Sequence, residues 1–205
     1  MLPQKDGAFS LDSLPLLLNN LEKVNALLIV PGWSQSESVS EFLQQLLKEA
    51  QLPPLVIDAD GLRHLAKITD WYKKLPKGSV LTPHPGEMSA LTGMDIASIQ
   101  ADRMETARKF AVQWGQVVLL KGALSVVASP QGQVMVVPVA TPALARAGTG
   151  DVLAGMLAAF IAQGMESFQA AAAAAWVHAR AGQMAAEELF TTASVIASDV
   201  IEFIP

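Results

Sequence analysis

Four short apolar segments, each followed by a polar or glycine-containing turn, constrain the fold of this chain most strongly. They occupy residues 26–30, 55–57, 80–81 and 117–120. Short runs that are apolar throughout are typical of strands buried on both faces of a parallel sheet. Because helix-like stretches separate these runs, the sequence predicts a doubly wound, mostly parallel α/β sheet flanked by helices and joined by right-handed crossovers.

The intervals between the strands show helical periodicity, and a different pattern follows the fourth strand. The helices expected from apolar spacing are 11–24, 38–50, 61–74 and 101–114. Residues 125–129 and 133–138 flank Pro130-Gln131-Gly132 and predict an antiparallel hairpin. Two alanine-rich helices are expected after this C-terminal hairpin, at about 150–163 and 166–188.

Composition restricts the classes of function open to the chain. Its 205 residues fit one domain, and 14 basic against 19 acidic residues give a net charge of −5. This charge argues against a nucleic-acid partner, which needs a basic face. The absence of cysteine excludes disulfides and thiolate chemistry and suits a cytoplasmic location. The longest apolar stretch, Val152–Ala162, is too short to cross a membrane.

The turns that follow the four strands form the first candidate site, because ligands of open α/β sheets bind at the carboxyl ends of the strands. These turns are Pro31-Gly-Trp-Ser34, Asp58-Ala-Asp-Gly61, His84-Pro-Gly-Glu87 and Lys121-Gly-Ala123. Each one alone also suits an ordinary turn or helix cap. Their expected convergence at one edge of the sheet is what indicates a site.

The strongest local signal is Gly148-Thr149-Gly150-Asp151, which immediately precedes an apolar helical segment. Glycines allow several backbone N–H groups to point into one space, and the N-terminus of the helix adds unpaired N–H groups and positive potential. This combination favours a phosphate site. Asp151 has two interpretations, a helix cap or a general base beside a transferring phosphate. The common P-loop and dinucleotide fingerprints are absent from the sequence.

Residues 141–155 resemble the C-terminal signature of the ribokinase-like superfamily. With Leu81–Glu87, Asp58–Asp60 and Lys121-Gly122, the resemblance narrows to the ADP/ATP-dependent NAD(P)H-hydrate dehydratases. It extends over essentially the whole chain and implies a single ribokinase-like domain, 1–205. Members of this family normally begin with a further N-terminal portion, and the chain resembles them only after it. The sequence departs from the family pattern at residues 30–34, 141–143 and 63.

The resemblance implies repair of hydrated NAD(P)H, in its (S)-epimer, by phosphorylation of the ring hydroxyl and elimination of phosphate. It implies ADP or ATP with Mg²⁺, and Asp151 as the catalytic base that also contacts the substrate. The other implied substrate-binding residues are Gly32, Ser34 and His84. The implied nucleotide-binding residues are Lys121, Gly122, Ala123, Leu124, Ser125, Gly148, Thr149 and Gly150. Asp58 and Asp60 are the candidate metal ligands.

Two other functions remain open at this point. A small-molecule kinase of the same superfamily, acting on a vitamin precursor or a sugar, would share Asp151 and the anion site. A shortened family member could bind a nucleotide without turnover. The His84–Glu87 segment favours the dehydratase. A homo-oligomer is expected, as for most enzymes of this kind. His178, within an alanine-rich helix, is expected to be a packing residue.

Overall fold

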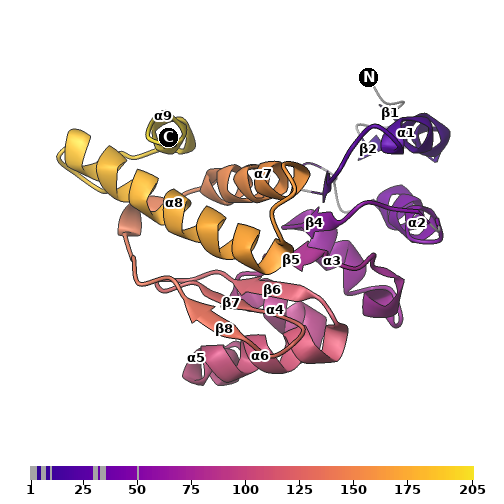
Figure 1. The fold of residues 1–205 in the computed structure, drawn as a ribbon, viewed down its shortest axis with the longest axis horizontal. Helices are drawn as coiled ribbons and strands as arrows, with labels where there is room; N and C mark the ends of the chain where they lie inside the picture. Colours follow the sequence, from indigo (N-terminus) through magenta and orange to yellow (C-terminus); the bar gives the residue numbers. More distant parts are fainter. Residues whose placement is uncertain (1–3, 6–7, 10, 30–31, 33–35, 50) are drawn as a thin grey trace.

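The computed structural model describes residues 4–5, 8–9, 11–29, 32, 36–49 and 51–205 (Figure 1). Its centre is a six-stranded sheet in the order β3-β4-β5-β6-β7-β8, so β3 is an edge strand within the described residues. The strands are β3 (Leu27–Ile29), β4 (Leu55–Ile57), β5 (Val80–Leu81), β6 (Val117–Leu120), β7 (Val126–Ala128) and β8 (Val134–Val136). A separate antiparallel pair joins β1 (Gln4–Lys5) to β2 (Ala8–Phe9).

The four predicted strands pair in parallel, and the predicted hairpin is present. Strands β3 to β6 are parallel neighbours, with Leu27 opposite Leu55 at the start of the sheet. Strand β7 runs antiparallel to both β6 and β8. These pairings confirm the mostly parallel sheet, and they place the ends of β4, β5 and β6 along one edge.

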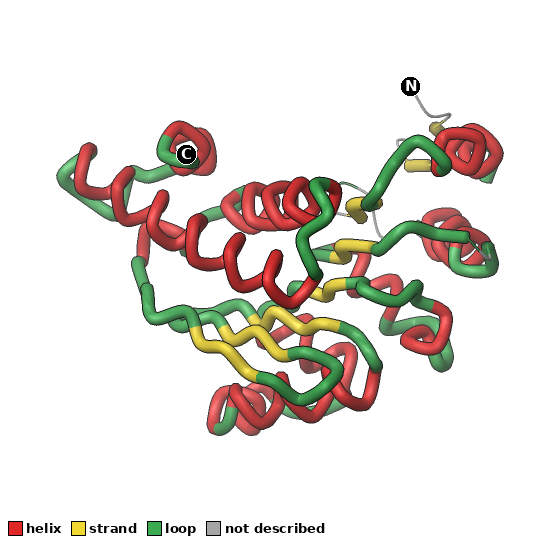
Figure 2. The backbone as a smooth tube through the Cα atoms, in the orientation of Figure 1, coloured by secondary structure: helices red, strands yellow, loops and turns green. Residues whose placement is uncertain are grey.

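Helices cover both faces of the sheet, as Figures 1 and 2 show. Alternate residues of one strand point to opposite faces. Leu55 and Ile57 therefore pack into one core with Phe42, whereas Val56 packs into the other with Leu157. The first core is covered by α1 (Ser13–Leu21), α2 (Glu37–Leu46), α3 (Asp60–Leu65), α4 (Pro85–Thr92), α5 (Ile96–Ala101) and α6 (Arg103–Trp114). The second is covered by α7 (Thr149–Ala162) and α8 (Ser167–Glu188).

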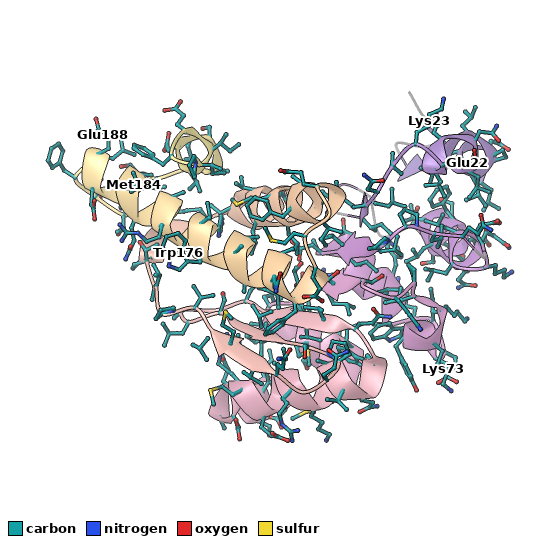
Figure 3. The ribbon with its side chains drawn as sticks, viewed as in Figure 1. Glu22, Lys23, Lys73, Trp176, Met184 and Glu188 are labelled. Carbon is teal, nitrogen blue, oxygen red and sulfur yellow. The ribbon has the colours of Figure 1, made fainter. Side chains whose placement is uncertain are left out.

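The alanine-rich helices have two different sides. The alanines at 170, 171, 174 and 175 of α8 are buried against the sheet and α7. Small side chains allow this close helix packing, which is the physical use of the alanine run. On the other side of α8, Trp176 and Met184 are exposed to solvent (Figure 3). Beyond α8, the short helix α9 (Ala197–Glu202) packs back against it.

Several parts of the secondary structure differ from the prediction, and the β1–β2 pair is one that the sequence did not predict. The helix expected over 61–74 is two elements, α3 and the 3₁₀ helix η1 (Trp71–Lys74), because Asp70 adopts a left-handed conformation with φ of 53°. Residues 85–87, expected as a turn, form the first turn of α4, since proline suits the first position of a helix. Helices α5 and α9 were not predicted. Each has only six residues, too few for a clear periodicity.

Gly61 is a position where the fold tolerates no side chain. A Cβ there would lie 2.8 Å from Ile29 Cγ2 and 2.9 Å from Ile57 Cγ2, both in the buried core. We expect Gly61→Ala to lower the free energy of unfolding by about 1–3 kcal/mol, because the core must shift to admit the methyl group. Urea unfolding of the wild type and the variant measures this change in the free energy of unfolding. Gly155→Ala in α7 is the matched control, since no atom lies near its Cβ position. The control should be neutral or slightly stabilising. Equal effects at the two sites would contradict the packing argument.

Among the residues that the structure describes, no helix is both long enough and apolar enough to cross a bilayer.

Candidate active site

Three of the four turns predicted to converge meet at Lys121. Its ammonium Nζ lies 2.5 Å from Asp58 Oδ1, which follows β4, and 3.8 Å from Glu87 Oε2 at the start of α4. The carboxylates of Asp58 and Glu87 are 2% and 5% exposed. One lysine therefore links the loops after β4, β5 and β6 through two buried anions. In the fourth turn Gly32 is left-handed, with φ of 91°. Ser34 lies outside the described residues.

His84 is the N-cap of α4, and the cap fixes its tautomer. Its Nδ1 accepts hydrogen bonds from the backbone N–H groups of Gly86 and Glu87, at 2.9 and 3.3 Å. A neutral imidazole that accepts at Nδ1 carries its proton at Nε2. The Nε2 atom lies 3.3 Å from Glu87 Oε1, and the half-exposed ring leaves it within reach of a ligand. His84 is thus a hydrogen-bond donor at the edge of the site.

Glu87 is a site residue that our sequence analysis did not single out. Its Oε2 accepts a hydrogen bond from the His84 backbone N–H at 2.9 Å, which completes a capping box. The same carboxylate faces Lys121 Nζ. The three-residue spacing between His84 and Glu87 is the signal that could have identified it, because a capping box has this spacing.

The predicted anion site lies at the N-terminus of α7. Gly148 is the N-cap, with φ of 86°, a conformation that favours glycine. The Thr149 hydroxyl lies 2.7 Å from the Leu144 carbonyl oxygen and 2.9 Å from that of Arg146, so it anchors the turn. A Cβ at Gly150 would lie 3.6 Å from Asp58 Oδ2 and 3.7 Å from Lys121 Nζ. The helix N-terminus, Lys121 and Asp58 are therefore immediate neighbours.

Asp151 is in the first turn of α7 but is not its N-cap, because Gly148 occupies that position. Asp151 is exposed, but partial desolvation by the surrounding residues raises the pKa of its carboxyl above the usual range. The nearby Asp58 raises this pKa further, and Lys121 partly offsets both effects. A raised pKa makes a carboxylate a stronger base. The environment of Asp151 therefore suits the general-base interpretation of the sequence better than the cap interpretation.

A cavity of about 460 Å³ opens beside this charged cluster. Its lining includes six of the predicted nucleotide-binding residues: Lys121, Gly122, Ala123, Ser125, Thr149 and Gly150. Gly148 and Leu124 do not line it, and the Leu124 side chain is 48% exposed. The remaining walls are mainly apolar and come from the segment that follows β8, the 3₁₀ helix η2 (Pro142–Leu144), α7 and α8. Sequence analysis did not find these walls, because apolar residues carry no chemical signature.

His178 of α8 also lines the cavity and is 6% exposed. Among the described residues its Nε2 has no hydrogen-bond partner. Burial lowers the pKa of His178 to about 4, and a hydrogen bond with the Thr149 backbone acts in the opposite direction. The ring is therefore neutral at neutral pH, packed behind the first turn of α7.

Because His178 is buried, we expect the free energy of unfolding to depend on pH. Its pKa is 6.5 when exposed and about 4 in the fold, so the unfolded state binds more protons between these values. The corresponding stabilisation is present above pH 6.5 and is lost as the pH falls towards 4. It amounts to about 3 kcal/mol. We expect His178→Phe to remove this part of the slope in urea unfolding measured across the range. Identical slopes for the two proteins would contradict the assignment.

The described residues do not build a metal cage. Asp58, one of the two candidate ligands, is held by Lys121, and no group of three or more His, Cys, Asp or Glu side chains gathers around one point in the described chain. Mg²⁺ in nucleotide sites is commonly held by the substrate's phosphates with only one or two carboxylates. The assignment of Asp58 and Asp60 to a metal stays a prediction.

Comparison with known proteins gives a consistent result. A family model described as NAD(P)H-hydrate dehydratase matches residues 8–205. A bifunctional NAD(P)H-hydrate repair enzyme of Moorella thermoacetica is 43% identical over 97% of this chain, which covers 37% of that protein. An ADP-dependent (S)-NAD(P)H-hydrate dehydratase of Neisseria meningitidis is 35% identical over 87% of this chain and is covered to 61%.

The solved structures agree with the sequence relatives. The ADP/ATP-dependent NAD(P)H-hydrate dehydratase of Bacillus subtilis, co-crystallised with ATP and Mg²⁺, matches with a TM-score of 0.76 and 31% identity. The match covers 88% of this chain and 62% of that one. Matches to ribokinase-like proteins at lower identity confirm the predicted ribokinase-like fold. The chain spans between about a third and two thirds of the length of these relatives. On the family model and these relatives, the chain belongs to the NAD(P)H-hydrate dehydratase family.

Proposed function

We propose that this chain returns the (S)-epimer of hydrated NAD(P)H to NAD(P)H, using ADP or ATP. The observation that supports this proposal most strongly is the position of Asp151. A carboxylate with a raised pKa stands at the N-terminus of α7, beside Lys121 and a largely apolar cavity. This arrangement provides a base, an anion site and a nucleoside pocket in one place. The activities named for the relatives support the same reaction.

The chemistry follows from the poor leaving ability of hydroxide. Asp151 takes the proton of the ring hydroxyl, and the freed oxygen attacks the terminal phosphorus of the nucleotide. The bond from that phosphorus to the bridging oxygen breaks, and AMP (from ADP) or ADP (from ATP) leaves with the electrons of that bond. The N–H groups at the start of α7 and the Lys121 ammonium stabilise the charge on the transferring phosphate. The bond between the ring carbon and the phosphate oxygen then breaks, and phosphate leaves with the electrons of that bond. The lone pair of the ring nitrogen forms a double bond to the same carbon. Loss of a proton from the neighbouring ring carbon restores the ring double bond of NAD(P)H.

The remaining site residues take the roles that the resemblance implied. The base and ribose of the nucleotide occupy the cavity, and its phosphates extend towards Lys121, Gly148 and Gly150. His84 donates from Nε2 to the hydrated dinucleotide, which also contacts the turn containing Gly32 and Ser34. Mg²⁺ would be held by the nucleotide phosphates, with Asp58 and Asp60 as the predicted ligands from the chain, and it would neutralise phosphate charge. We place the reaction in the cytoplasm, in agreement with the absence of cysteine from the sequence.

Recovery of dihydronicotinamide absorbance tests this proposal. The purified chain is given the hydrated dinucleotide and Mg²⁺, with ADP or ATP in parallel reactions and a third reaction without nucleotide. We expect absorbance to return only where a nucleotide is present. Asp95→Asn, which alters the exposed cap of α5, is the control variant and should behave as the wild type. Failure to recover absorbance with either nucleotide would refute the proposed function.

A further inference from the structure

Arg103 of α6 holds the two ends of the turn that carries the predicted nucleotide-binding residues. Its guanidinium Nη2 donates to the Leu120 carbonyl at 2.9 Å and to the Leu124 carbonyl at 3.2 Å. Its Nη1 donates to Gln100 Oε1 at 3.0 Å. Leu120 ends β6 directly before Lys121, and Leu124 directly precedes Ser125. One half-buried side chain thus links the residue that precedes the 121–125 turn to a residue near its end.

The guanidinium also packs against the backbone of Gly122. A Cβ built at Gly122 would overlap Nη1 and Nη2 and would lie 2.5 Å from Cζ. The three nearest atoms all belong to the guanidinium, which is the far end of a flexible side chain. The absence of a side chain at residue 122 therefore leaves room for the guanidinium in its present place, and a methyl group there would displace it. This role of residue 122 is independent of any backbone conformation reserved for glycine, since the φ of Gly122 is not positive.

Arginine suits this role for a physical reason. Its planar fork presents several N–H donors in fixed directions, so it can bridge two carbonyls that a single ammonium group could not hold together. Hydrogen bonds from a charged donor are also stronger than neutral ones. Arg103 itself does not line the cavity, whereas Lys121, Gly122 and Ala123 do. The turn therefore lies between the guanidinium and the cavity.

We propose that Arg103 is a positioning residue for nucleotide binding, which holds the 121–125 turn in its binding conformation from the side away from the ligand, and that Gly122 makes room for it. The proposal rests on the proposed function, because it takes the ligand of this turn to be a nucleoside diphosphate or triphosphate. A turn ordered in advance lowers the entropic cost of binding. Losing Arg103 should therefore weaken the nucleotide more than the hydrated dinucleotide.

Affinity for ADP and ATP, measured by titration calorimetry, tests the role of Arg103 separately from turnover. We expect Arg103→Lys and Arg103→Ala each to weaken nucleotide binding by about tenfold, because neither side chain can hold the Leu120 and Leu124 carbonyls together. The KM for the nucleotide should rise by a similar factor, with kcat and the KM for the dinucleotide little changed. Arg108→Ala is the matched control. It removes an exposed arginine of the same helix that pairs with Glu105, and it should bind as the wild type.

A double-mutant cycle separates positioning from a general structural effect. Gly122→Ala should weaken nucleotide binding in the wild type, where its methyl group meets the guanidinium, and should cost little more once Arg103→Ala has removed that group. Additive losses, or Arg103 variants that are folded and bind nucleotide within about twofold of the wild type, would overturn the proposal. A wild-type chain that binds nucleotide without turnover would refute the function alone. A chain that binds no nucleotide would refute both.

Discussion

Replacing Asp151 with asparagine is expected to reduce turnover of hydrated NAD(P)H by about a thousandfold, within the range that general-base catalysis contributes. Asparagine has nearly the same shape but cannot accept the hydroxyl proton. The fold should be preserved, because Gly148 caps α7 and Asp151 is exposed. Steady-state kcat gives the loss, and calorimetry should show ADP affinity almost unchanged. A variant that keeps more than about a tenth of the activity would exclude Asp151 as the base.

The same carboxylate predicts the shape of the pH profile. A base works only when it is deprotonated, so activity should fall on the acid side as the pH drops through the pKa of Asp151. Partial desolvation and the neighbouring Asp58 raise this pKa. The acid limb of kcat/KM should therefore lie above about 3.9, the ordinary value for aspartate. An acid limb at or below that value would conflict with the environment of Asp151.

Replacing Lys121 with methionine is expected to produce the largest loss of stability in the site, about 3–5 kcal/mol. Lys121 Nζ lies 2.5 Å from Asp58, whose side chain is 2% exposed, and 3.8 Å from the buried Glu87. Removing the cation leaves two carboxylates buried without a neutralising charge, which costs more than the pair itself contributes. Urea unfolding at neutral pH measures the loss.

The double variant Asp58→Asn with Lys121→Met is the control for this prediction. A neutral amide at position 58 needs no cation, so it should recover part of the stability lost in the single variant. Stability of Lys121→Met within about 1 kcal/mol of the wild type would show that the lysine does not neutralise these carboxylates, since that is the range of an exposed ion pair.

The sequence predicted the sheet well because its strands are apolar on both faces. The run 117–120 could be identified as β6 from its residues alone, and all four of its side chains are buried. Sequence patterns were less informative where the local structure depends on the conformation or hydrogen bonds of one residue. The break between α3 and η1 depends on a left-handed Asp70. The start of α4 depends on a histidine that caps a helix, a role more often taken by serine, threonine or aspartate.

The parts of the candidate site that consist of residues adjacent in the sequence could be predicted. Gly148–Asp151 indicated an anion site and a carboxylate, and the fold places them beside Lys121. The residues that sequence analysis did not single out act across the fold. Arg103 reaches the 121–125 turn from a neighbouring helix, and Glu87 meets Lys121 only because β5 and β6 are adjacent. Spacing along the chain does not encode such contacts.

The fate of the terminal phosphate of the nucleotide tests the proposed reaction most directly. In a single turnover, nucleotide labelled in that phosphate is mixed with enzyme and hydrated dinucleotide, and labelled inorganic phosphate and NAD(P)H are measured together. We predict that one labelled inorganic phosphate appears for each NAD(P)H formed, with no stable phosphorylated product. Label retained on an organic product without formation of NAD(P)H would contradict the dehydratase and identify a kinase.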